Sequence, residues 1–349
     1  MGLPDTNGQH RPVKIRVTRK GELYDLTEFV DRHPGGREIL EQHNGLDIEA
    51  AMQNSSVHAH SKAAYSMLER YAVGTTDTSA QQNELLTEVA DIDKRRADYK
   101  KNDIVDWSKP ILGQVEFLGE KYFDWTHQPV DWPVRLFESD LAETFSNAYW
   151  WFVPVTWVPV VLYMIWSSFQ HLSHVPEVWP QNALAIQHGP LSMPFLFAFG
   201  VLMWTFLEYF IHRWIFHLRP PPNWPSLIRL HFALHGQHHK SPMDPMRLVF
   251  PPLPASFFAV PFYFMSTSLF PVGLAQITFA GIVSGYMSYD LIHYYLHHGK
   301  KPFLAYFQQL KSYHNLHHYK YQQLGFGISS KFWDYPFGTL IPENPEKNK

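Results

Sequence analysis

The stretch LVFPPLPASFFAVPFYFMSTSLFPVGLAQITFAGIVSGYMSY, residues 248–289, contains no Asp, Glu, Lys or Arg. A hydrocarbon core about 30 Å thick is crossed by a helix of about 20 apolar residues, so this stretch can form two such helices. The turn between them is expected around Pro271-Val272-Gly273. Two more charge-free stretches, Thr144–Pro176 and Val178–Leu207, can supply one helix each. The pattern predicts an all-α integral membrane domain with four transmembrane helices.

A large soluble core is the alternative interpretation of these stretches. Core helices of this length normally carry a charged residue on their outer face, which favours the membrane. The mean hydropathy of -0.25 does not argue against a membrane, because it averages polar and apolar segments of the chain.

The composition of the 349-residue chain excludes several functional classes. A net charge of -3 and the lack of a long basic block argue against a nucleic-acid-binding protein. Cysteine is absent, which excludes disulfides, thiolate metal sites, iron–sulfur clusters and a cysteine nucleophile. Histidine is the enriched residue type, with 21 in the chain.

Positive charge is distributed unevenly around the four expected helices. Arg135 precedes the first helix, and two basic groups follow the second and the fourth. These groups are Arg213, Arg219, Arg229, Lys240 and Arg247, and Lys300, Lys301, Lys311, Lys320 and Lys331. The turns after the first and third helices carry neither Lys nor Arg. Since Lys and Arg remain on the cytosolic side of a membrane, both termini and the long middle loop are expected in the cytosol.

Ten histidines gather in four groups on this same cytosolic side. The groups are His212 and His217; His235, His238 and His239; His293 and His297; and His314, His317 and His318. Spacings of three and four residues place imidazoles on one face of a helix, as metal ligation requires. The five-residue spacing of the first pair is out of phase with an α-helix and predicts a π-bulge or a fraying helix end.

Ten imidazoles are too many for one tetrahedral zinc ion, and they suit two ions of four to six ligands each. Imidazole accommodates zinc, copper, iron or nickel, so the ligand type leaves the metal open. Histidines that merely pack in a core are the structural alternative, which ten at ligand spacing disfavour. His231 and His298 fit the spacing less well and are not included. A dimetal site in a cytosolic histidine-rich cap beside long apolar helices suggests O₂-dependent chemistry on a lipid chain, and iron is the metal suited to it.

The N-terminal part of the chain differs in composition from the rest. Residues 1–10 are expected to form a disordered tail, 11–75 a small globular module and 76–104 a partly helical linker. No apolar segment typical of a secretory signal is present. Gly2 and Thr6 fit a myristoylation pattern, which is interpreted as a chance match.

Residues 33–36 read His-Pro-Gly-Gly, and His58 and His60 follow further on. Glycines allow the chain to turn tightly beside a flat cofactor. A second histidine across the pocket would complete a bis-imidazole haem suited to electron transfer. The segment resembles cytochrome b5, a small α+β fold that binds haem b. The second ligand of that family usually precedes a serine, which favours His60 over His58 as the partner of His33.

The remainder, residues 105–349, resembles the fatty acid 2-hydroxylase family of the fatty acid hydroxylase superfamily. The resemblance rests on Tyr289–His297, His231–Lys240, Arg247–Pro252, Gly325–Ser329 and the segment from Val105 to Leu141. It implies 2-hydroxylation of long and very-long acyl chains, free or as the N-acyl chain of ceramide, in the endoplasmic reticulum membrane. It also implies that the ten histidines named above are the metal ligands. Asp290 matches an acidic position beside the site and is expected to accept the other N–H of a ligand histidine.

The mechanism that the resemblance implies requires several cofactors and partners. Haem held by His33 and His60 would pass electrons from an NAD(P)H-dependent flavoprotein reductase to two metal ions. Iron is expected in the active enzyme, and zinc is possible in purified protein. Membrane lipids surround the domain, and a fatty acyl or ceramide lipid and O₂ are the substrates.

Two other functions remain open at this stage. An acyl or sterol desaturase or oxidase would use the same histidine chemistry, and lipid profiling separates it from a hydroxylase. A transporter or a membrane-anchored electron carrier would not be an enzyme. Transport needs polar groups at bilayer depth, which the charge-free stretches lack, and a carrier needs no ten-histidine cluster.

Overall fold

The computed structural model describes residues 14–30, 33, 37–53, 60, 62–75, 96–182, 184–299 and 304–342. The chain divides into two compact units, with the boundary between Asp103 and Ile104. The N-terminal tail with Gly2 and Thr6, Pro34–Gly36, His58 and most of the expected linker lie outside the described residues.

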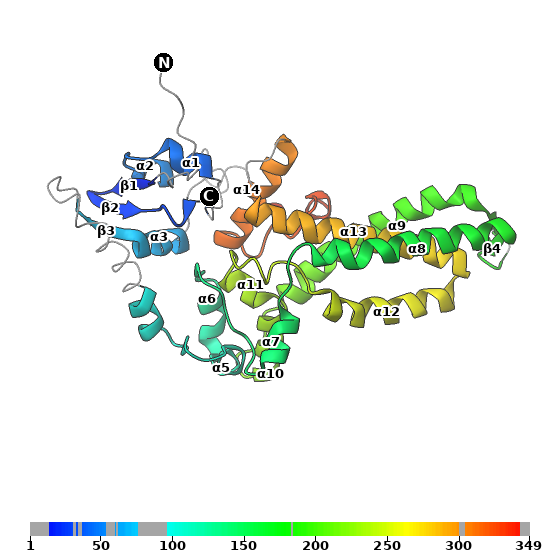
Figure 1. Cartoon of the computed structure of the whole chain (residues 1–349), viewed down its shortest axis with the longest axis horizontal. Helices are drawn as coiled ribbons and strands as arrows, with labels where there is room; N and C mark the ends of the chain where they lie inside the picture. Colours follow the sequence, from blue (N-terminus) through cyan, green and yellow to red (C-terminus); the bar gives the residue numbers. More distant parts are fainter. Residues whose placement is uncertain are drawn as a thin grey trace, which may run out of the picture. The chain divides into compact units, whose positions relative to one another are not determined.

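The N-terminal unit has an antiparallel sheet with the strand order β1-β2-β3 (Figure 1). The strands are β1 Arg16–Arg19, β2 Glu22–Asp25 and β3 Ala72–Thr75. Lys20 and Gly21, between β1 and β2, both have positive φ angles, as a tight two-residue hairpin turn requires. Short helices follow: α1 Arg37–Gln42, α2 Glu49–Gln53, α3 Lys62–Leu68 and the 3-10 helix η2 Glu69–Tyr71. The small α+β fold agrees with the prediction.

Apolar side chains from the sheet and helices form the core of this unit. Ile15 and Val17, two residues apart on one face of the chain entering β1, are fully buried. The other buried residues include Tyr24, Leu26, Val30, Leu40, Met52, Leu68 and Tyr71. Burial of every second residue at the start of β1 is the pattern of a strand with one buried face.

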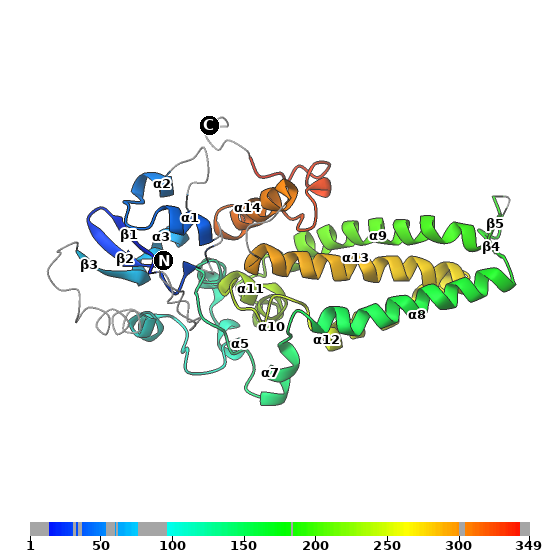
Figure 2. The same ribbon diagram turned by 45° about the horizontal axis from the view of Figure 1, so that its top comes forward.

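Four long helices form the second unit together with a cap at one of their ends (Figure 2). The helices are α8 Phe152–His174, α9 Met193–Phe210, α12 Pro252–Leu269 and α13 Val272–His298. Helix α13 packs against α8 through a core that includes Trp157, Val161, Phe279 and Val283. It crosses α9 at Gly200 and Gly281, where a Cβ on either glycine would overlap the backbone of the other helix.

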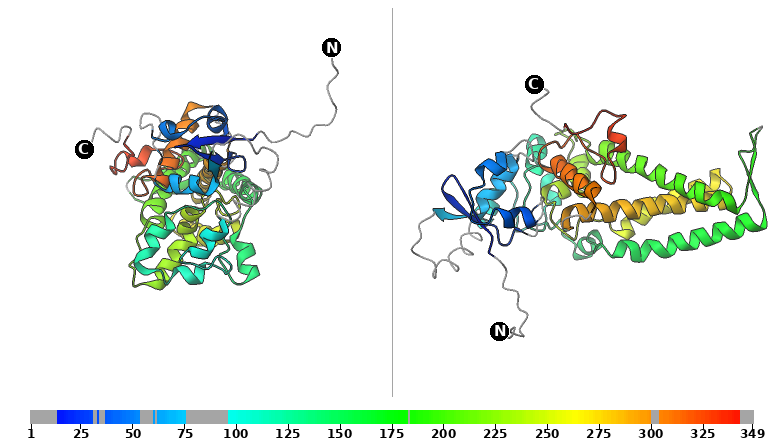
Figure 3. Two further views of the ribbon diagram at one scale, coloured as in Figure 1. Left: turned by 90° about the vertical axis from the view of Figure 1, so that its left-hand side faces the viewer. Right: turned by 90° about the horizontal axis from the view of Figure 1, so that it is seen from above.

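The α8–α9 and α12–α13 connections lie at the end of the bundle opposite the cap (Figure 3). A small hairpin of β4 Glu177–Trp179 and β5 Ile186–His188 joins α8 to the 3-10 helix η4 Pro190–Ser192 and α9. The Glu177 carboxylate accepts hydrogen bonds from the backbone N–H groups of Gly273, at 2.9 Å, and Leu274, at 3.0 Å. One side chain therefore ties the α8–α9 connection to the start of α13.

Two helical segments are long and apolar enough to span a membrane, Phe152–His174 and Pro190–Phe216. Only 11% of the most apolar window of the second is buried, which is unlike the core helix of a soluble protein. The prediction of four spans is thus supported for two of them. Helices α12 and α13 fall short because prolines, serines, tyrosines, glycines and the histidines and Asp290 of the last turns lower their hydropathy.

The cap is built from short helices before and after the long ones. Before α8 come α5 Leu112–Val115, η3 Gly119–Lys121, α6 Tyr122–Thr126 and α7 Asp140–Ser146. After α9 come η5 Ile211–Phe216, α10 Pro225–His231, η6 Phe232–Gly236 and α11 Gln237–Lys240, and after α13 come α14 Ala305–Tyr319 and η7 Phe332–Asp334. An apolar core with Tyr122, Trp125, Ile228 and Phe232 holds the segments together.

Candidate metal centres

All ten predicted ligand histidines are buried in the cap, each no more than 6% exposed. They come from four pieces of helix: η5 with the residue that follows it, η6 with α11, the last turns of α13, and α14. The first two pieces contain π-helical turns, η5 and η6. The π-bulge expected from the five-residue spacing of His212 and His217 is therefore present.

The first cluster consists of five histidines whose ligand atoms all lie within 4.8 Å of one another: His238, His293, His297, His314 and His318. The ring of His297 lies between 4.8 and 5.1 Å from each of the other four rings. His238 and His314 are farther apart, with ring centres at 6.4 Å and planes 15° from parallel. These two therefore face each other across the centre of the cluster.

The second cluster contains His212, His217, His235 and His317, whose ligand atoms again lie within 4.8 Å of one another. His239 joins them, because its Nε2 lies 3.1 Å from that of His235 and 3.3 Å from that of His217. The ring of His217 lies between 4.6 and 4.9 Å from the rings of the other four. In each cluster one ring, that of His297 or His217, thus lies close to all four others.

Neighbours in the sequence are divided between the two clusters. His238 belongs to the first and His239 to the second, whereas His317 belongs to the second and His318 to the first. The rings of His239 and His318 lie 4.4 Å apart, so the clusters are adjacent.

The chemistry of the donor atoms fits a cation in each cluster. His212 and His317 hydrogen-bond through Nδ1 with the carbonyls of Phe326, at 2.6 Å, and Leu324, at 2.7 Å. If each Nδ1 carries the proton, each Nε2 presents a lone pair toward His217, whose Nε2 is 3.2 and 3.0 Å away. Converging lone pairs repel one another unless a cation lies between them. The second-sphere carbonyls orient the rings as they do in metal sites.

Burial keeps these imidazoles uncharged. Loss of solvent around the rings, followed by their mutual repulsion as cations, lowers the pKa values of seven cap histidines outside the long helices well below 6.5. These are His217, His235, His238, His239, His314, His317 and His318. Neutral imidazole is the form that binds a metal ion. The clusters are therefore prepared for metal at neutral pH.

A cavity of about 670 Å³ begins at the clusters and extends between the long helices. His235, His238 and His293 line it at the cap end. Most of its wall is apolar, and it includes Leu207, Ala255, Phe258, Ala259, Phe262, Phe279, Ile282 and Val283. Its size is that of a ligand pocket, about 300–1,000 Å³. An elongated apolar ligand can thus reach the histidines from within the helix bundle.

The N-terminal unit brings its two predicted ligands together as well. The rings of His33 and His60 face each other with centres 6.4 Å apart and planes 22° from parallel. Two metal–imidazole bonds of about 2 Å each, with the distance from each nitrogen to its ring centre, span about 6 Å. The backbone N–H of His60 donates to the carbonyl of Met52 at 2.8 Å, and its Nδ1 lies 3.3 Å from the same oxygen. This contact occupies Nδ1 and leaves Nε2 of His60 as the nitrogen available to a haem iron.

Comparisons with known proteins agree with this geometry. Residues 197–339 match the Fatty acid hydroxylase family, and residues 7–77 match the Cytochrome b5-like Heme/Steroid binding domain. Fatty acid 2-hydroxylase of Mus musculus is 45% identical over 342 residues, covering 94% of this chain and 91% of the mouse protein. The chain belongs to the fatty acid 2-hydroxylase family. Its N-terminal unit is a cytochrome b5-like domain, a kind of domain that implies haem.

Other members of the fatty acid 2-hydroxylase family extend the comparison. Ceramide very long chain fatty acid hydroxylase SCS7 of Saccharomyces cerevisiae is 35% identical, covering 93% of this chain and 90% of the yeast protein. The solved structure described as "Full length scs7p (only hydroxylase domain visible)" superposes with a TM-score of 0.60 at 37% identity. The superposition covers 71% of the present chain and 90% of the chain in the solved structure.

Asp290 contacts the backbone in this fatty acid 2-hydroxylase family member. Its carboxylate accepts the backbone N–H of Phe250, with distances of 3.2 and 3.1 Å to the two oxygens. The expected contact with a ligand histidine is not among the hydrogen bonds described for Asp290. His293 instead hydrogen-bonds with the backbone of Leu248. Asp290 and His293 together hold the segment that precedes α12, which the sequence alone did not indicate.

Two residues beside the second cluster were missed by the sequence analysis. The ring of His127 lies 5.1 Å from that of His239, and the Nδ1 of His127 is 2.8 Å from the carbonyl of Phe123. Lys240 is fully buried, with its Nζ 4.2 Å from the centre of the Trp125 ring and hydrogen-bonded to the Trp125 carbonyl. Neither has a partner at ligand spacing in the sequence, so no periodic signal could have found them.

The two histidines that the sequence analysis did not include among the ligands, His231 and His298, lie outside both clusters. His231 is in neither cluster, and its Nδ1 hydrogen-bonds with the Tyr122 hydroxyl. His298 is also in neither cluster among the described residues and packs against Tyr294, with ring centres 5.0 Å apart. Both are core residues of the cap.

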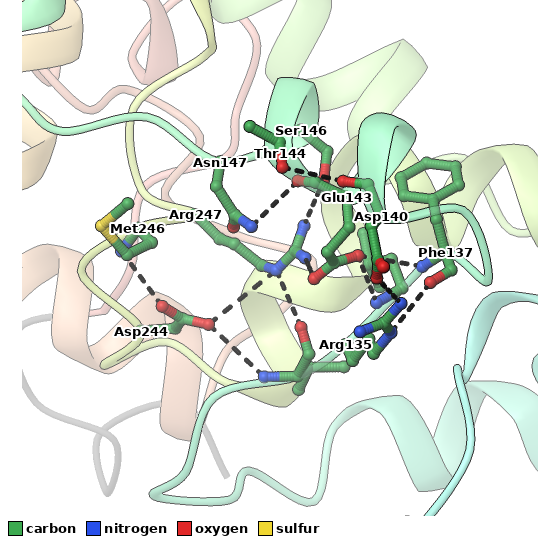
Figure 4. Close-up of polar contacts among 12 residues, drawn as sticks. Arg135, Phe137, Asp140, Glu143, Thr144, Ser146, Asn147, Asp244, Met246 and Arg247 are labelled. Carbon is green, nitrogen blue, oxygen red and sulfur yellow. Dashed lines mark hydrogen bonds and ion pairs between the residues drawn. The ribbon is translucent and has the colours of Figure 1, made fainter.

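A buried ion pair joins three segments at the edge of the cavity (Figure 4). The guanidinium of Arg247 pairs with Glu143 and donates to the Ser146 hydroxyl, at 3.2 Å, and the Val134 carbonyl, at 2.9 Å. The second carboxylate oxygen of Glu143 accepts the backbone N–H groups of Leu136, at 3.1 Å, and Phe137, at 3.0 Å. Arg247 thereby fixes the chain before α7, α7 itself and the segment entering α12.

Proposed function

We propose that this chain hydroxylates carbon 2 of long and very-long fatty acyl groups, free or as the N-acyl chain of ceramide. The observation that carries the proposal is the apolar cavity that begins at His238 and His293 of the first cluster. The curated relatives are named for fatty acid 2-hydroxylation and, in yeast, for hydroxylation of ceramide very long chain fatty acids. A cavity that leads an acyl chain to metal-binding histidines suits both substrates.

The ten clustered histidines would hold two metal ions, iron in the active enzyme and zinc as an inactive substitute. When bound, iron activates O₂ for oxidation of an unactivated C–H bond, which zinc cannot do because it has no redox chemistry. The cavity wall holds the acyl chain so that its first carbons lie beside the His238–His293 end. Its apolar residues exclude water from that end, and positioning of this kind lowers the barrier of the reaction.

Electrons would arrive through the N-terminal domain. His33 and His60 would ligate haem b from its two sides, leaving no position for O₂ and making the haem an electron carrier. An NAD(P)H-dependent flavoprotein reductase would supply this haem. The globular haem module is proposed to span residues 11–75, the linker 76–104 and the membrane hydroxylase domain 105–349.

All four long helices are proposed to lie in the endoplasmic reticulum membrane, with both termini and the metal site in the cytosol. Helix α12, all of whose residues are described, has none that is fully buried. Its outward residues include Leu253, Phe257, Val260, Phe264, Met265 and Leu269, all exposed. An apolar exposed face of this length next to two membrane-spanning segments favours a lipid environment. The basic residues around the cap favour the cytosolic orientation.

The experiment supplies full-length, iron-loaded protein with acyl substrate, O₂, NAD(P)H and a flavoprotein reductase, and analyses the lipids by mass spectrometry. A 2-hydroxy acyl product is expected, and new double bonds without C2 hydroxylation would instead identify a desaturase. Replacing His238 and His239 by Ala should abolish the product. His174→Ala, at an exposed position at the far end of α8, is the matched control and should retain it. Iron-loaded protein that yields no 2-hydroxy product would refute the proposal.

A further inference from the structure

The cavity ends at a pair of aromatic rings. Along α13 its lining runs from His293 to Phe279, and along α12 it runs from Pro254 to Phe262. Phe262 and Phe279 are the lining residues farthest from the clusters on their helices, and their ring centres lie 6.0 Å apart. The end of the cavity away from the metals is therefore closed by this pair, which we call the Phe262–Phe279 floor.

The helices are fastened together just beyond the floor. Tyr263 packs on Phe279 with ring centres 5.4 Å apart, and its hydroxyl accepts a hydrogen bond from the Gln276 side chain at 3.2 Å. Past these contacts, α12 and α13 converge on the turn at Phe270 and Pro271. The floor is thus held in place by a polar contact between the two helices that form the cavity walls.

The α12 side of the wall carries both small and large side chains. Its lining residues are Pro254, Ala255, Phe258 and Ala259, followed by Phe262 at the far end. They lie on one face of the helix. The two alanines leave room along this face, and Phe262 closes its end, so an unbranched acyl chain can lie in the slot between the clusters and the floor. Lengthening either alanine would shorten the slot.

The length of the slot follows from helix geometry. His293 and Phe279 are fourteen positions apart on α13, which at about 1.5 Å per residue is about 21 Å. A C–C bond of about 1.5 Å advances an extended chain by about 1.25 Å, so this length holds about 16 methylene groups. Adding the two carbons beside the metals gives a chain of about 18 carbons that ends at the floor.

We infer that Phe262 and Phe279 determine the acyl-chain length that the enzyme accepts. The inference rests on the proposed function and adds the residues that limit the length of the acyl chain. With the floor closed, chains of up to about 18 carbons fit extended between the clusters and the rings. A longer chain fits only when one of the two rings is displaced.

The test compares the full-length, metal-loaded protein with variants of the floor and the wall. Saturated acyl substrates of about 16 and about 24 carbons are supplied together, and the two 2-hydroxy products are quantified by mass spectrometry. Phe262→Ala and Phe279→Ala should raise the ratio of long to short product about tenfold or more, because one methylene in an apolar pocket already changes selectivity by about 10–200-fold. Ala259→Phe should lower the ratio by a similar factor. Phe257→Ala, on the exposed face of α12, should leave it unchanged.

An unchanged ratio in alanine variants that keep the wild-type metal content would overturn the inference. If both alanine variants fail to fold, Phe262→Leu and Ala259→Phe decide. Phe262→Leu should raise the ratio of long to short product, and Ala259→Phe should remove the long product while the short one is retained. Equal effects on the two products would overturn the inference. Thermal stabilisation by the two acyl chains, measured without turnover, should follow the same order in the same variants. A wild-type protein that forms no product of either length would refute the proposed function. Thermal stabilisation by the two acyl chains would then still test whether Phe262 and Phe279 limit chain length.

Discussion

The backbone N–H of His217 donates to the carbonyl of His212, five residues earlier, at 3.1 Å. In an α-helix two residues with this spacing point to different sides. The π-helical hydrogen bond adds one residue to the turn and brings the two rings to 4.8 Å, with Nε2 atoms 3.2 Å apart. One irregular turn therefore completes the second cluster.

Removing the His217 ring from the second cluster should remove one metal ion. His217→Ala deletes the imidazole that lies close to all four others, so metal content should fall from about two ions per chain to about one. Metal analysis of purified protein checks this. His231→Gln, which alters a buried histidine outside both clusters, should keep both ions. Equal metal loss in the two variants would contradict the assignment.

Haem binding should depend on His60 and not on His58. His60→Ala removes one of the two facing rings and should convert the absorption spectrum of the haem from a bis-imidazole to a single-imidazole type. His58→Ala should leave the spectrum unchanged, because the sequence predicts that His58 is not a ligand. The reverse pattern in the spectra of the two variants would exchange their roles.

The Arg247–Glu143 pair should contribute strongly to the stability of the cap. Arg247→Met leaves the partly buried Glu143 carboxylate and the buried Asp244 carboxylate without the guanidinium that pairs with both, at a cost of about 3 kcal/mol. In a domain of this size the melting temperature should fall by about 6–12 °C. Arg135→Met is the control, because Arg135 pairs at the surface with the exposed Asp140 and such pairs contribute about 0–1 kcal/mol. Thermal unfolding in detergent that gives equal shifts for both variants would contradict this ranking.

The crossing of α9 and α13 should not tolerate an added methyl group. Gly281→Ala places a Cβ against the backbone of Phe197 and Gly200, which should cost about 1–3 kcal/mol. Gly113→Ala, in α5 with no atom near the new methyl, should be neutral or stabilise by about 0.4–1 kcal/mol. Melting temperatures of the two variants, measured side by side, test the difference. A Gly281→Ala protein with an unchanged melting temperature would show that α9 and α13 can move apart without loss of stability.

The clustering of the ten histidines could be predicted from the sequence, because residues three or four positions apart lie on the same face of a helix. It could not assign them to individual ions, since His238 and His239 are neighbours and yet belong to different clusters. The contact of Asp290 with the backbone of Phe250, forty residues away, could not be predicted, because such a hydrogen bond leaves no periodic pattern in the sequence. His127 and Lys240 were missed for the same reason.

The number of spanning helices was less accessible to prediction. The absence of charge marks three stretches that are long enough for four helices, whereas hydropathy selects two helical segments. Helix α13 is buried against α8 and α9 over much of its length, so its small and polar residues serve packing and not contact with lipid. Composition alone does not distinguish a helix that faces lipid from one that other helices surround.

The division of adjacent histidines between the clusters has a consequence for how the two sites can change. One peptide link, between His238 and His239, and a second, between His317 and His318, connect the two clusters. Backbone geometry therefore limits the separation of the clusters at two places. If each cluster holds one ion, inserting a residue at either link should turn the following ring away from its cluster and weaken both sites together.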